Sequence, residues 1–497
     1  MLDIIIKGGS IIDGSGSAPY SADIGIKDGR IEKIGNLTED AEAVIDAAGL
    51  TVTPGFIDSH SHSDNQIFSH PEMREKIEQG ITTSIGGQCG SSLLCKKEMP
   101  KDFFEKAAET KLGSSLATFV GHGSVRAAVM NYENREPSAE ELSKMKELVR
   151  ESIRRGAVGM STGLIYNPGM FAKTDELIEL SRVCCEEGGI LASHIRGESD
   201  TLIEAVDEFL TIVRATGCRG IISHHKACYS RNHGKVNETL HMIDKINSEG
   251  YDVYCDVYPY LASGTSLAAR FVPKIYQADG NTLKNIKDEK IRKIIIEHNE
   301  KSYDVSHIDW ALIKHCKDHP EYQGRYICDI AKEMGCSDID AALNLIEISD
   351  NSCSACFFSM CEEDVATVIS HPRAMICTDS GVATSSAPYH PRLRASFVKA
   401  IRRFVRELGV VSLPEMIRKM TSLPAFVYNL KGKGLIKEGY DADICVFNYE
   451  KLTDKSDYLD PFPKSEGLNY VISGGEIVCE DAVYNGKLPA KFIPRTN

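Results

Sequence analysis

The chain has 497 residues, of which 42% are hydrophobic and 26% are charged. This composition is typical of a soluble globular protein and excludes a disordered, fibrous or small disulfide-stapled chain. At ~150 residues per domain the length allows about three units, although one α/β barrel can hold about 250 residues or more. The formal net charge of −14 argues against a nucleic-acid partner, because phosphate backbones are bound by an excess of Lys and Arg.

The sequence also argues against a membrane-bound or exported protein. No stretch approaches the ~18 uninterrupted apolar residues that a membrane span needs. The N-terminus has Asp3 ahead of a short apolar run and no basic leader, so we expect no secretory signal and a cytoplasmic location. There the 16 cysteines should be reduced thiols or metal ligands.

The two ends of the chain share a β-type pattern. Short apolar runs separated by Gly-rich and Asp-Gly turns lie at 3–7, 22–26 and 30–34, and again at 443–447, 470–472 and 477–478. Neither end is long enough to form its own core. We therefore expect residues 1–53 and 426–497 to pair into one small β-domain.

The middle of the chain, residues 54–425, alternates apolar runs with helical patterns. The runs begin near Val52, Ile81, Leu116, Ala157, Gly189, Gly220, Tyr251 and Ala374. The first seven lie roughly 30 to 40 residues apart, the repeat length of a βα unit, so eight runs predict a (β/α)₈ barrel of the TIM type. The last interval is too long by about 80 residues on this repeat. It predicts a charged, helical insertion between strands 7 and 8, at about 265–345, which either forms a lid over the barrel mouth or packs outside it.

Residue types that bind metal ions follow several of these runs. In a barrel, functional residues collect at the C-terminal ends of the strands. Five runs end in such residues: His60 and His62, then Cys89, His194, His224 with His225, and Asp379. Imidazole, thiolate and carboxylate are the ligands that Zn²⁺ takes. Each residue alone has an ordinary structural explanation, but metal-binding residue types at the C-terminal ends of five strands together predict a metal site.

These residues belong to longer motifs that resemble a known family. The motifs span 54–62, 87–90, 163–169, 193–198, 223–226, 256–260, 378–381, 390–392 and 437–443. Over nearly its whole length the chain resembles the amidohydrolase superfamily and, within it, the D-aminoacylase (N-acyl-D-amino-acid deacylase) family. His-x-His and Thr-Asp-Ser are superfamily features, whereas the cysteine after strand two and Gly-Leu-x-Tyr-x-Pro-Gly point to the deacylase branch.

The resemblance implies a set of zinc ligands. Cys89, His194 and His224 match the ligands of a tightly held zinc, and His60, His62 and Asp379, with Cys89 bridging, match a second, weaker site. Hydantoinase and dihydroorotase relatives bridge two metals with a strand-four lysine, but residues 155–163 contain none, so Cys89 takes that role. His225 follows His224 on a backbone expected to be extended and should point away from the metals.

The resemblance also implies a reaction and a substrate. Zinc lowers the pKa of bound water towards ~7, and Asp379 is positioned as the general base. Tyr166, Lys226 and Arg392 match the positions that bind the substrate carboxylate. With carboxylate and amide both fixed, only one enantiomer places its side chain in open space. We therefore expect a zinc-dependent hydrolase that converts N-acyl-D-amino acids, small-molecule substrates, into a D-amino acid and a carboxylate.

Some alternatives remain open at this point. Residues 393–397, Leu-Arg-Ala-Ser-Phe, depart from the family pattern: Arg394 either adds positive charge to the pocket, which would suit an acidic substrate side chain, or lies on a helix surface without a role. A hydrolase of cyclic amides, like dihydroorotase or hydantoinase, or of dipeptides would use the same scaffold, and a non-catalytic scaffold protein is a second alternative. The sequence leaves the acyl group, the preferred side chain, the number of metals and the oligomeric state undetermined.

Overall fold

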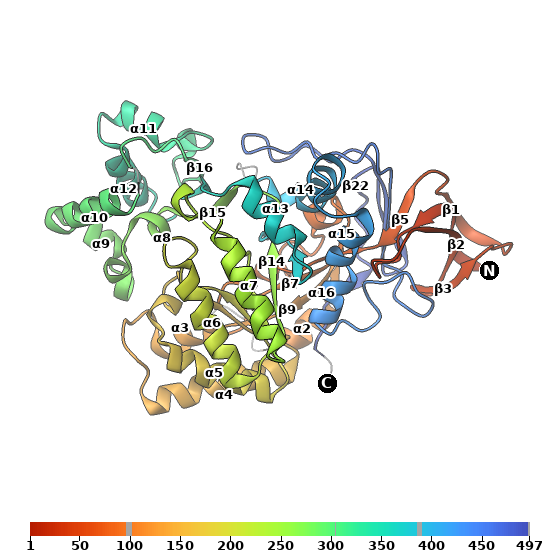
Figure 1. Cartoon of the computed structure of the whole chain (residues 1–497), viewed down its shortest axis with the longest axis horizontal. Helices are drawn as coiled ribbons and strands as arrows, with labels where there is room; N and C mark the ends of the chain where they lie inside the picture. The colour runs from red at the N-terminus through yellow and green to blue at the C-terminus, as the bar shows by residue number, and fades with distance from the viewer. Residues whose placement is uncertain (96–101, 304, 385–389, 496–497) are drawn as a thin grey trace.

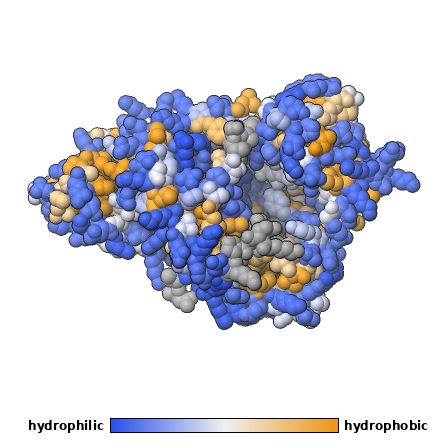
Figure 2. Space-filling view, turned by 180° about the vertical axis from the view of Figure 1, so that it is seen from behind, coloured by the Kyte–Doolittle hydropathy of each residue, from blue (hydrophilic) through white to orange (hydrophobic). Residues whose placement is uncertain are grey.

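The computed structural model of the chain describes residues 1–95, 102–303, 305–384 and 390–495. It has an α/β fold in which parallel strands and their helices occupy the middle of the molecule (Figure 1). The strands of the N-terminal segment lie at one end of the view and helices α8–α12 lie at the other. Hydrophilic side chains cover most of the face seen from behind, with smaller hydrophobic patches between them (Figure 2).

Both ends of the chain contribute to one nine-stranded sheet. From the N-terminal side come β1 (Leu2–Ile11), β2 (Tyr20–Lys27), β3 (Arg30–Gly35), β4 (Ala41–Asp46) and β5 (Thr51–Pro54). From the C-terminal side come β19 (Ile444–Phe447), β20 (Leu468–Ser473), β21 (Glu476–Glu480) and β22 (Val483–Tyr484). The two groups join where β5 pairs antiparallel with β19, so that Val52 lies opposite Val446. Strands from both ends of the chain therefore lie in one sheet.

The predicted barrel strands form two parallel sheets. One contains β6 (Phe56–Asp58), β7 (Ile81–Gly86) and β9 (Ser115–Thr118). The other contains β10 (Val120–Gly121), β11 (Gly159–Gly163), β12 (Ile190–His194), β13 (Gly220–Ile222), β14 (Val253–Val257) and β18 (Ala374–Ile376). The first predicted run, near Val52, is divided between two sheets. Its start forms β5 of the nine-stranded sheet, and only its end, β6, joins the parallel strands β7 and β9.

Backbone hydrogen bonds connect the two parallel sheets at both edges. The amide of Val158, just before β11, donates to Thr118 O of β9 at 2.9 Å, and the amide of Asp379, after β18, donates to His60 O at 2.9 Å. One buried apolar cluster also takes side chains from strands of both sheets, among them Ile57, Ile85, Ile221 and Met375. Their neighbours along each strand point outward instead, because successive side chains of a strand alternate between its faces.

Helices follow most of these strands and cover their outer side. They are α1 (Arg74–Ile77), α2 (Phe103–Glu109), α3 (His122–Met130), α4 (Ala139–Arg155), α5 (Thr174–Glu186), α6 (Leu202–Thr216), α7 (Lys235–Ser248), α13 (Glu362–Ser370), α14 (Arg392–Lys399), α15 (Leu413–Met420) and α16 (Ser422–Val427). In α4, Ser138 caps the first turn by accepting from the Glu141 amide, and Glu141 returns the bond. Its buried residues Met145, Val149 and Ile153 recur at helical spacing, so one face packs on the sheet.

The segment between β14 and β18 forms a smaller layer of its own. It contains a three-stranded antiparallel sheet in the order β15 (Ala262–Ser266), β17 (Ser354–Phe358), β16 (Ala311–His315). The helices are α8 (Leu267–Phe271), α9 (Thr282–Lys287), α10 (Glu289–Ser302), α11 (Ile327–Met334) and α12 (Asp338–Ile348). These elements share a hydrophobic cluster separate from that of the parallel strands. The sequence predicted helices here but not this sheet.

None of the helices in the described parts of the chain combines the length and the apolar character that a membrane span requires.

Candidate metal centre and substrate cavity

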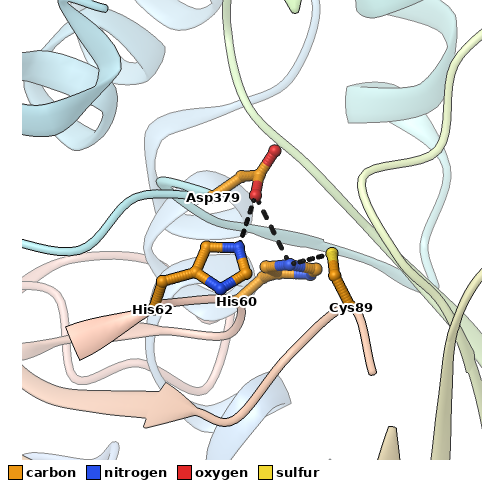
Figure 3. Close-up of side chains that lie close together, drawn as sticks. All are labelled: His60, His62, Cys89 and Asp379. Atoms are coloured by element: carbon orange, nitrogen blue, oxygen red, sulfur yellow. Dashed lines mark hydrogen bonds and ion pairs between the residues drawn. The ribbon is translucent and has the colours of Figure 1, made fainter. Parts of the chain in front are cut away.

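Four predicted ligands meet at the ends of three strands. His60 and His62 follow β6, Cys89 follows β7 and Asp379 follows β18, and one ligand atom of each lies within 4.8 Å of the others. Asp379 Oδ1 is 3.1 Å from His62 Nε2 and 3.5 Å from His60 Nε2, and Cys89 Sγ is 3.3 Å from His60 Nε2 (Figure 3). The side chains point toward one another, as Figure 3 shows, so they could share one ion.

A second group contains the remaining predicted ligands. His194 is the last residue of β12, and His224 lies two residues beyond β13. Their ring nitrogens and Cys89 Sγ all lie within 4.8 Å of one another, with Cys89 Sγ 3.3 Å from His224 Nε2. Because Cys89 belongs to both groups, the structure brings together all six residues assigned to the two metal positions.

Three of these residues have a left-handed backbone. Cys89, His224 and Asp379 have φ values of 53°, 36° and 47°, a region that side chains other than glycine seldom adopt. Such strain persists where the surrounding structure holds it and is concentrated at functional sites. Here Asp256 Oδ1 accepts the His224 amide at 2.6 Å, which fixes one of the three turns.

The positive φ of His224 corrects one argument from sequence. The sequence predicts an extended backbone at 224–225 and so a His225 that points away, but the chain turns at His224. His225 is nonetheless outside both ligand groups, because its Nε2 is hydrogen-bonded to Thr239 Oγ1 of α7 at 2.7 Å.

The charges of the site favour bound cations. Burial alone would raise the pKa of the Cys89 thiol, but His60 and His224 lower that pKa well below its usual value. Burial would likewise raise the pKa of Asp379, whereas Arg392 and His224 lower it well below its usual range. Cys89 and Asp379 are therefore anionic, the form in which each binds a metal.

The donor set fits zinc. It combines imidazole nitrogens, a thiolate and a carboxylate, which are the ligand types of Zn²⁺ sites. Both ring nitrogens of His194 are buried and have no hydrogen-bond partner within the described part of the chain. Buried polar groups are normally satisfied, so these atoms point to a ligand that the protein itself does not supply.

A buried ion pair fixes the strand ends that carry three of the ligands. Lys76 of α1 donates to Asp58 Oδ2 and to Ser380 O, each at 2.8 Å, while Thr378 Oγ1 donates to the same Asp58 oxygen at 2.6 Å. Lys76 and Asp58 are fully buried. This network connects the end of β6 to the end of β18 and so holds the histidine pair opposite Asp379.

The predicted carboxylate-binding residues line the same cavity as the ligands. The cavity has a volume of about 830 Å³ and is lined by Tyr166, Lys226 and Arg392 as well as by His62, Cys89, His194, His224 and Asp379. Arg392 Nη1 donates to Asp379 Oδ2 at 2.7 Å. Lys226 donates to Glu198 Oε1 at 2.5 Å, and Tyr166 OH accepts from Thr265 Oγ1 at 3.3 Å.

Two further cavity residues were not assigned from sequence. Glu198 Oε1 lies 3.0 Å from His224 Nδ1 and 2.5 Å from Lys226 Nζ, so it can orient a predicted ligand. The Tyr258 hydroxyl is buried without a partner in the described structure, and its ring lies beneath both Arg392 and Lys226, at 4.9 and 5.5 Å. Both residues lie in motifs that carry the family resemblance, but only the spatial contacts indicate what they do.

Arg394 fits neither role proposed from sequence. Its side chain is only 11% exposed, and it forms ion pairs with Glu78 at 2.8 Å and Glu75 at 3.2 Å. It is not among the residues that line the cavity. Arg394 therefore joins α14 to α1 in the interior and adds no charge to the pocket.

Comparison with known proteins identifies the family. The family model described as "Amidohydrolase family" matches residues 43–183 and 362–479. The chain belongs to the amidohydrolase family. Among curated amidohydrolases, the N-acyl-D-glutamate deacylase of Alcaligenes xylosoxydans xylosoxydans is 34% identical over 95% of this chain and 93% of the relative. The D-aminoacylase of the same organism is 32% identical over 99% of this chain and 98% of its own length.

A solved amidohydrolase structure extends this similarity to the fold. The N-acyl-D-glutamate deacylase of Bordetella bronchiseptica, complexed with zinc and a phosphonate mimic of the tetrahedral intermediate, superimposes with a TM-score of 0.86. The two chains are 32% identical, and the match covers 99% of this chain and 100% of the other. The amidohydrolase described here therefore belongs to the D-aminoacylase branch, as its motifs predicted. The insertion lies between the two segments that the family model matches, 43–183 and 362–479.

Proposed function

We propose that the protein is a zinc-dependent N-acyl-D-amino-acid deacylase, which hydrolyses a linear amide to a D-amino acid and a carboxylate. The observation that carries the proposal is one cavity in which a zinc-type donor set lies beside Arg392 and Lys226. The donors suit amide activation, and the two cations suit a substrate with a free carboxylate. The similarity to D-aminoacylase over nearly the whole chain supports the same assignment.

The metal ligands divide into two sets. Cys89, His194 and His224 would hold the tightly bound zinc, and His60, His62 and Asp379, with Cys89 shared, would form the weaker position. Zinc bound there would supply a Lewis acid that activates water at neutral pH. His224 Nδ1 is hydrogen-bonded to Lys226 Nζ at 2.8 Å and lies 3.0 Å from Glu198 Oε1, and its Nε2 is directed at Cys89 and the metal position.

Asp379 would act as the general base. Its Oδ1 faces the two histidines of the weaker position, and its Oδ2 is held by Arg392. A carboxylate fixed in this way can take a proton from the attacking water and return it to the departing amine. The low pKa of Asp379 keeps it ionised at neutral pH, the form that a base must have.

Tyr166, Lys226 and Arg392 would bind the substrate's α-carboxylate, and Tyr258 would add a fourth group. Only Nη1 of Arg392 is hydrogen-bonded to Asp379, so other N–H groups of the guanidinium remain for a carboxylate. Lys226 adds a second positive charge, and burial raises the pKa of Tyr258 well above its usual value, so its hydroxyl remains a neutral donor. Tyr166 lies across the cavity with its ring against His194, at 5.0 Å between centroids. With the carboxylate and the amide both fixed, one hand of the α-carbon is selected.

We also infer the finer architecture. The edge hydrogen bonds and the shared apolar cluster support closure of the two parallel sheets into one (β/α)₈ barrel, residues 54–425, with an insertion at about 265–345. The nine-stranded sheet supports a small β-domain formed by 1–53 and 426–497. We also propose that the protein acts in the cytoplasm, where its 16 cysteines would stay reduced.

Paired N-acetyl-D- and N-acetyl-L-amino acids test the proposal. The protein is freed of metal by chelation and assayed before and after zinc is restored. We expect turnover of the D substrates alone, and only with zinc. Turnover of dihydroorotate, hydantoins or dipeptides in place of these substrates would favour the cyclic-amide or dipeptide alternative, and failure of the purified protein to retain zinc would favour a non-catalytic scaffold.

A further inference from the structure

A buried aspartate lies behind the metal ligands and has no role in the function described so far. Asp256 belongs to β14 (Val253–Val257), is fully buried and does not line the cavity. In the part of the chain that the structure describes, no lysine or arginine forms an ion pair with it, and its ion-pair partner is His60. A buried carboxylate is normally paired with a cation or bound to a metal. The position of Asp256 therefore indicates that its counter-charge is the centre formed by the ligands.

One oxygen of Asp256 contacts a ligand of each metal position. Oδ1 accepts the backbone amide of His224, a ligand of the tight position, at 2.6 Å. The same atom lies 3.4 Å from Nδ1 of His60, a ligand of the weaker position. The two histidines follow different strands, β13 and β6, and belong to different ligand groups. Asp256 thus connects the two positions from behind, as Cys89 does from within.

The contact with His60 orients the imidazole ring. With Nδ1 facing Asp256, the ring directs Nε2 at Cys89 Sγ, 3.3 Å away, and at Asp379 Oδ1, 3.5 Å away. A histidine that binds a metal through one nitrogen usually donates its other N–H to an acceptor such as a carboxylate, which fixes the tautomer. His60 Nδ1 and Asp256 Oδ2 are both buried without a hydrogen bond in the described residues. Asp256 is therefore placed as the acceptor for a proton on His60 Nδ1.

The contact with His224 holds a left-handed turn. His224 has a φ of 36°, a conformation that persists where the surrounding structure holds it. Asp256 accepts both amides of this turn, that of His224 at Oδ1 and that of His225 at its backbone oxygen, at 2.8 Å. The turn directs His224 Nε2 at Cys89 Sγ, 3.3 Å away. Asp256 therefore sets the position of His224 through the backbone and that of His60 through the ring.

We propose that Asp256 is a positioning residue shared by the two metal positions, so that its loss weakens zinc binding at both. The proposal rests on the proposed function, because the ions concerned are the zinc of that function. It distinguishes Asp256 from two other carboxylates of the site. Asp379 belongs to the weaker position alone, and Glu198 lies beside His194 and His224, ligands of the tight position.

The first test measures zinc affinity without substrate. Metal-free protein is titrated with zinc in competition with a chromophoric chelator, and the weaker position fills at the higher zinc concentration. Asp256→Ala should raise Kd at both positions by roughly 10- to 100-fold, the usual effect of losing the partner of a metal ligand. Asp256→Asn keeps the shape and one oxygen acceptor, so it should raise both Kd values by less. Asp379→Ala should raise Kd at the weaker position alone.

A second buried carboxylate provides the matched control. Asp364 of α13 also accepts a backbone amide, that of Gly234, at 2.9 and 3.0 Å, but it is neither a ligand nor a cavity residue. We expect Asp364→Asn to leave both Kd values unchanged. Equal increases in Asp364→Asn and Asp256→Asn would show a general loss of stability and overturn the proposal.

Cobalt in place of zinc gives a readout that a merely structural role would not move. The visible absorption of bound Co²⁺ depends on the arrangement of its ligands. At full Co²⁺ occupancy, Asp256→Asn should have a spectrum different from that of wild type. KM for N-acetyl-D-amino acids should stay unchanged, because Asp256 does not line the cavity. A wild-type spectrum in this variant would overturn the proposal.

The zinc titration also separates the possible failures. If the wild-type protein retains no zinc, the proposed function itself fails. If it retains zinc and Asp256→Ala binds zinc with wild-type affinity, the role of Asp256 fails while the deacylase function stands. A rise in Kd at one position alone would also overturn the proposal, because Asp256 would then serve a single histidine.

Discussion

At the scale of single residues, the site depends on where protons reside. Cys89 and Cys95 both line the cavity, yet their environments differ. Burial raises the pKa of Cys95 to about 11, whereas the histidines around Cys89 lower its pKa well below the usual value. One cysteine is therefore a thiolate placed to bind metal and the other a neutral thiol.

Substitution of the two cysteines and of Asp379 should separate metal binding from proton transfer. Cys89→Ala should lose the tightly bound zinc together with activity, because it removes an atom shared by both ligand groups. Asp379→Ala should lower kcat by at least about 100-fold, the usual share of a general base, and keep the tight zinc. Metal content by mass spectrometry and kcat check both results, with Cys95→Ala as the control that should change neither. Loss of the tight zinc from Asp379→Ala would contradict this division of roles.

The Tyr258 hydroxyl should contribute to substrate binding. Tyr258→Phe should raise KM for N-acetyl-D-amino acids by roughly tenfold, since one hydrogen bond to a charged group is lost. Tyr260→Phe is a close control: its hydroxyl is also buried and unpartnered in the described structure, but Tyr260 does not line the cavity. Steady-state kinetics should show an effect for the first variant alone, and equal effects would remove Tyr258 from the site.

At the scale of elements, the sequence predicts features that depend on local patterns and misses those that depend on contacts between distant strands. Apolar runs and the residues that end them are local patterns, so the parallel strands and the six predicted ligands could be named in advance. The three strands of the insertion pair across as many as 96 residues, as between Ala262 and Phe358 at the extremes of β15 and β17, so no local pattern predicts this sheet. The turns at Cys89 and His224 and the link between Lys76 and Asp58 also depend on spatial neighbours.

The Lys76–Asp58 pair should matter for both stability and metal binding. Lys76→Met would leave Asp58 buried without its charge partner, which typically costs about 3–5 kcal/mol. Thermal unfolding should show a clearly lower Tm, and the weaker metal position should lose occupancy because Lys76 no longer links Asp58 to Ser380 O. The exposed pair of Lys33 and Glu39 provides the control, since Lys33→Met should leave Tm unchanged. Equal Tm values for the Lys76 and Lys33 variants would refute the structural role.

At the scale of the whole molecule, the metal position connects strands that are far apart in the chain. The ligands follow β6, β7, β12, β13 and β18, so an ion bound among them restrains most of the parallel strands together. A ligand that binds only the folded state raises its stability.

Zinc should therefore stabilise the fold as well as enable activity. Chelation should lower Tm, and zinc at a hundredfold excess over Kd should restore about 2.7 kcal/mol. Differential scanning calorimetry of wild type and of Cys89→Ala measures the effect. The variant should show no comparable rise on addition of zinc. A similar rise in both proteins would indicate that zinc binds elsewhere.

The separate hydrophobic cluster of the insertion has a consequence for how such enzymes diversify. Thr265, Arg270 and Lys314 of the insertion line the cavity, so one contiguous stretch would contribute to substrate recognition, whereas the chemistry of cleavage would reside in strand ends scattered along the rest of the chain. Exchange of that stretch between homologous genes could change the substrate preference of the enzyme without damaging the reaction. Grafting the segment from a relative of different preference onto this scaffold would be a direct route to new deacylases.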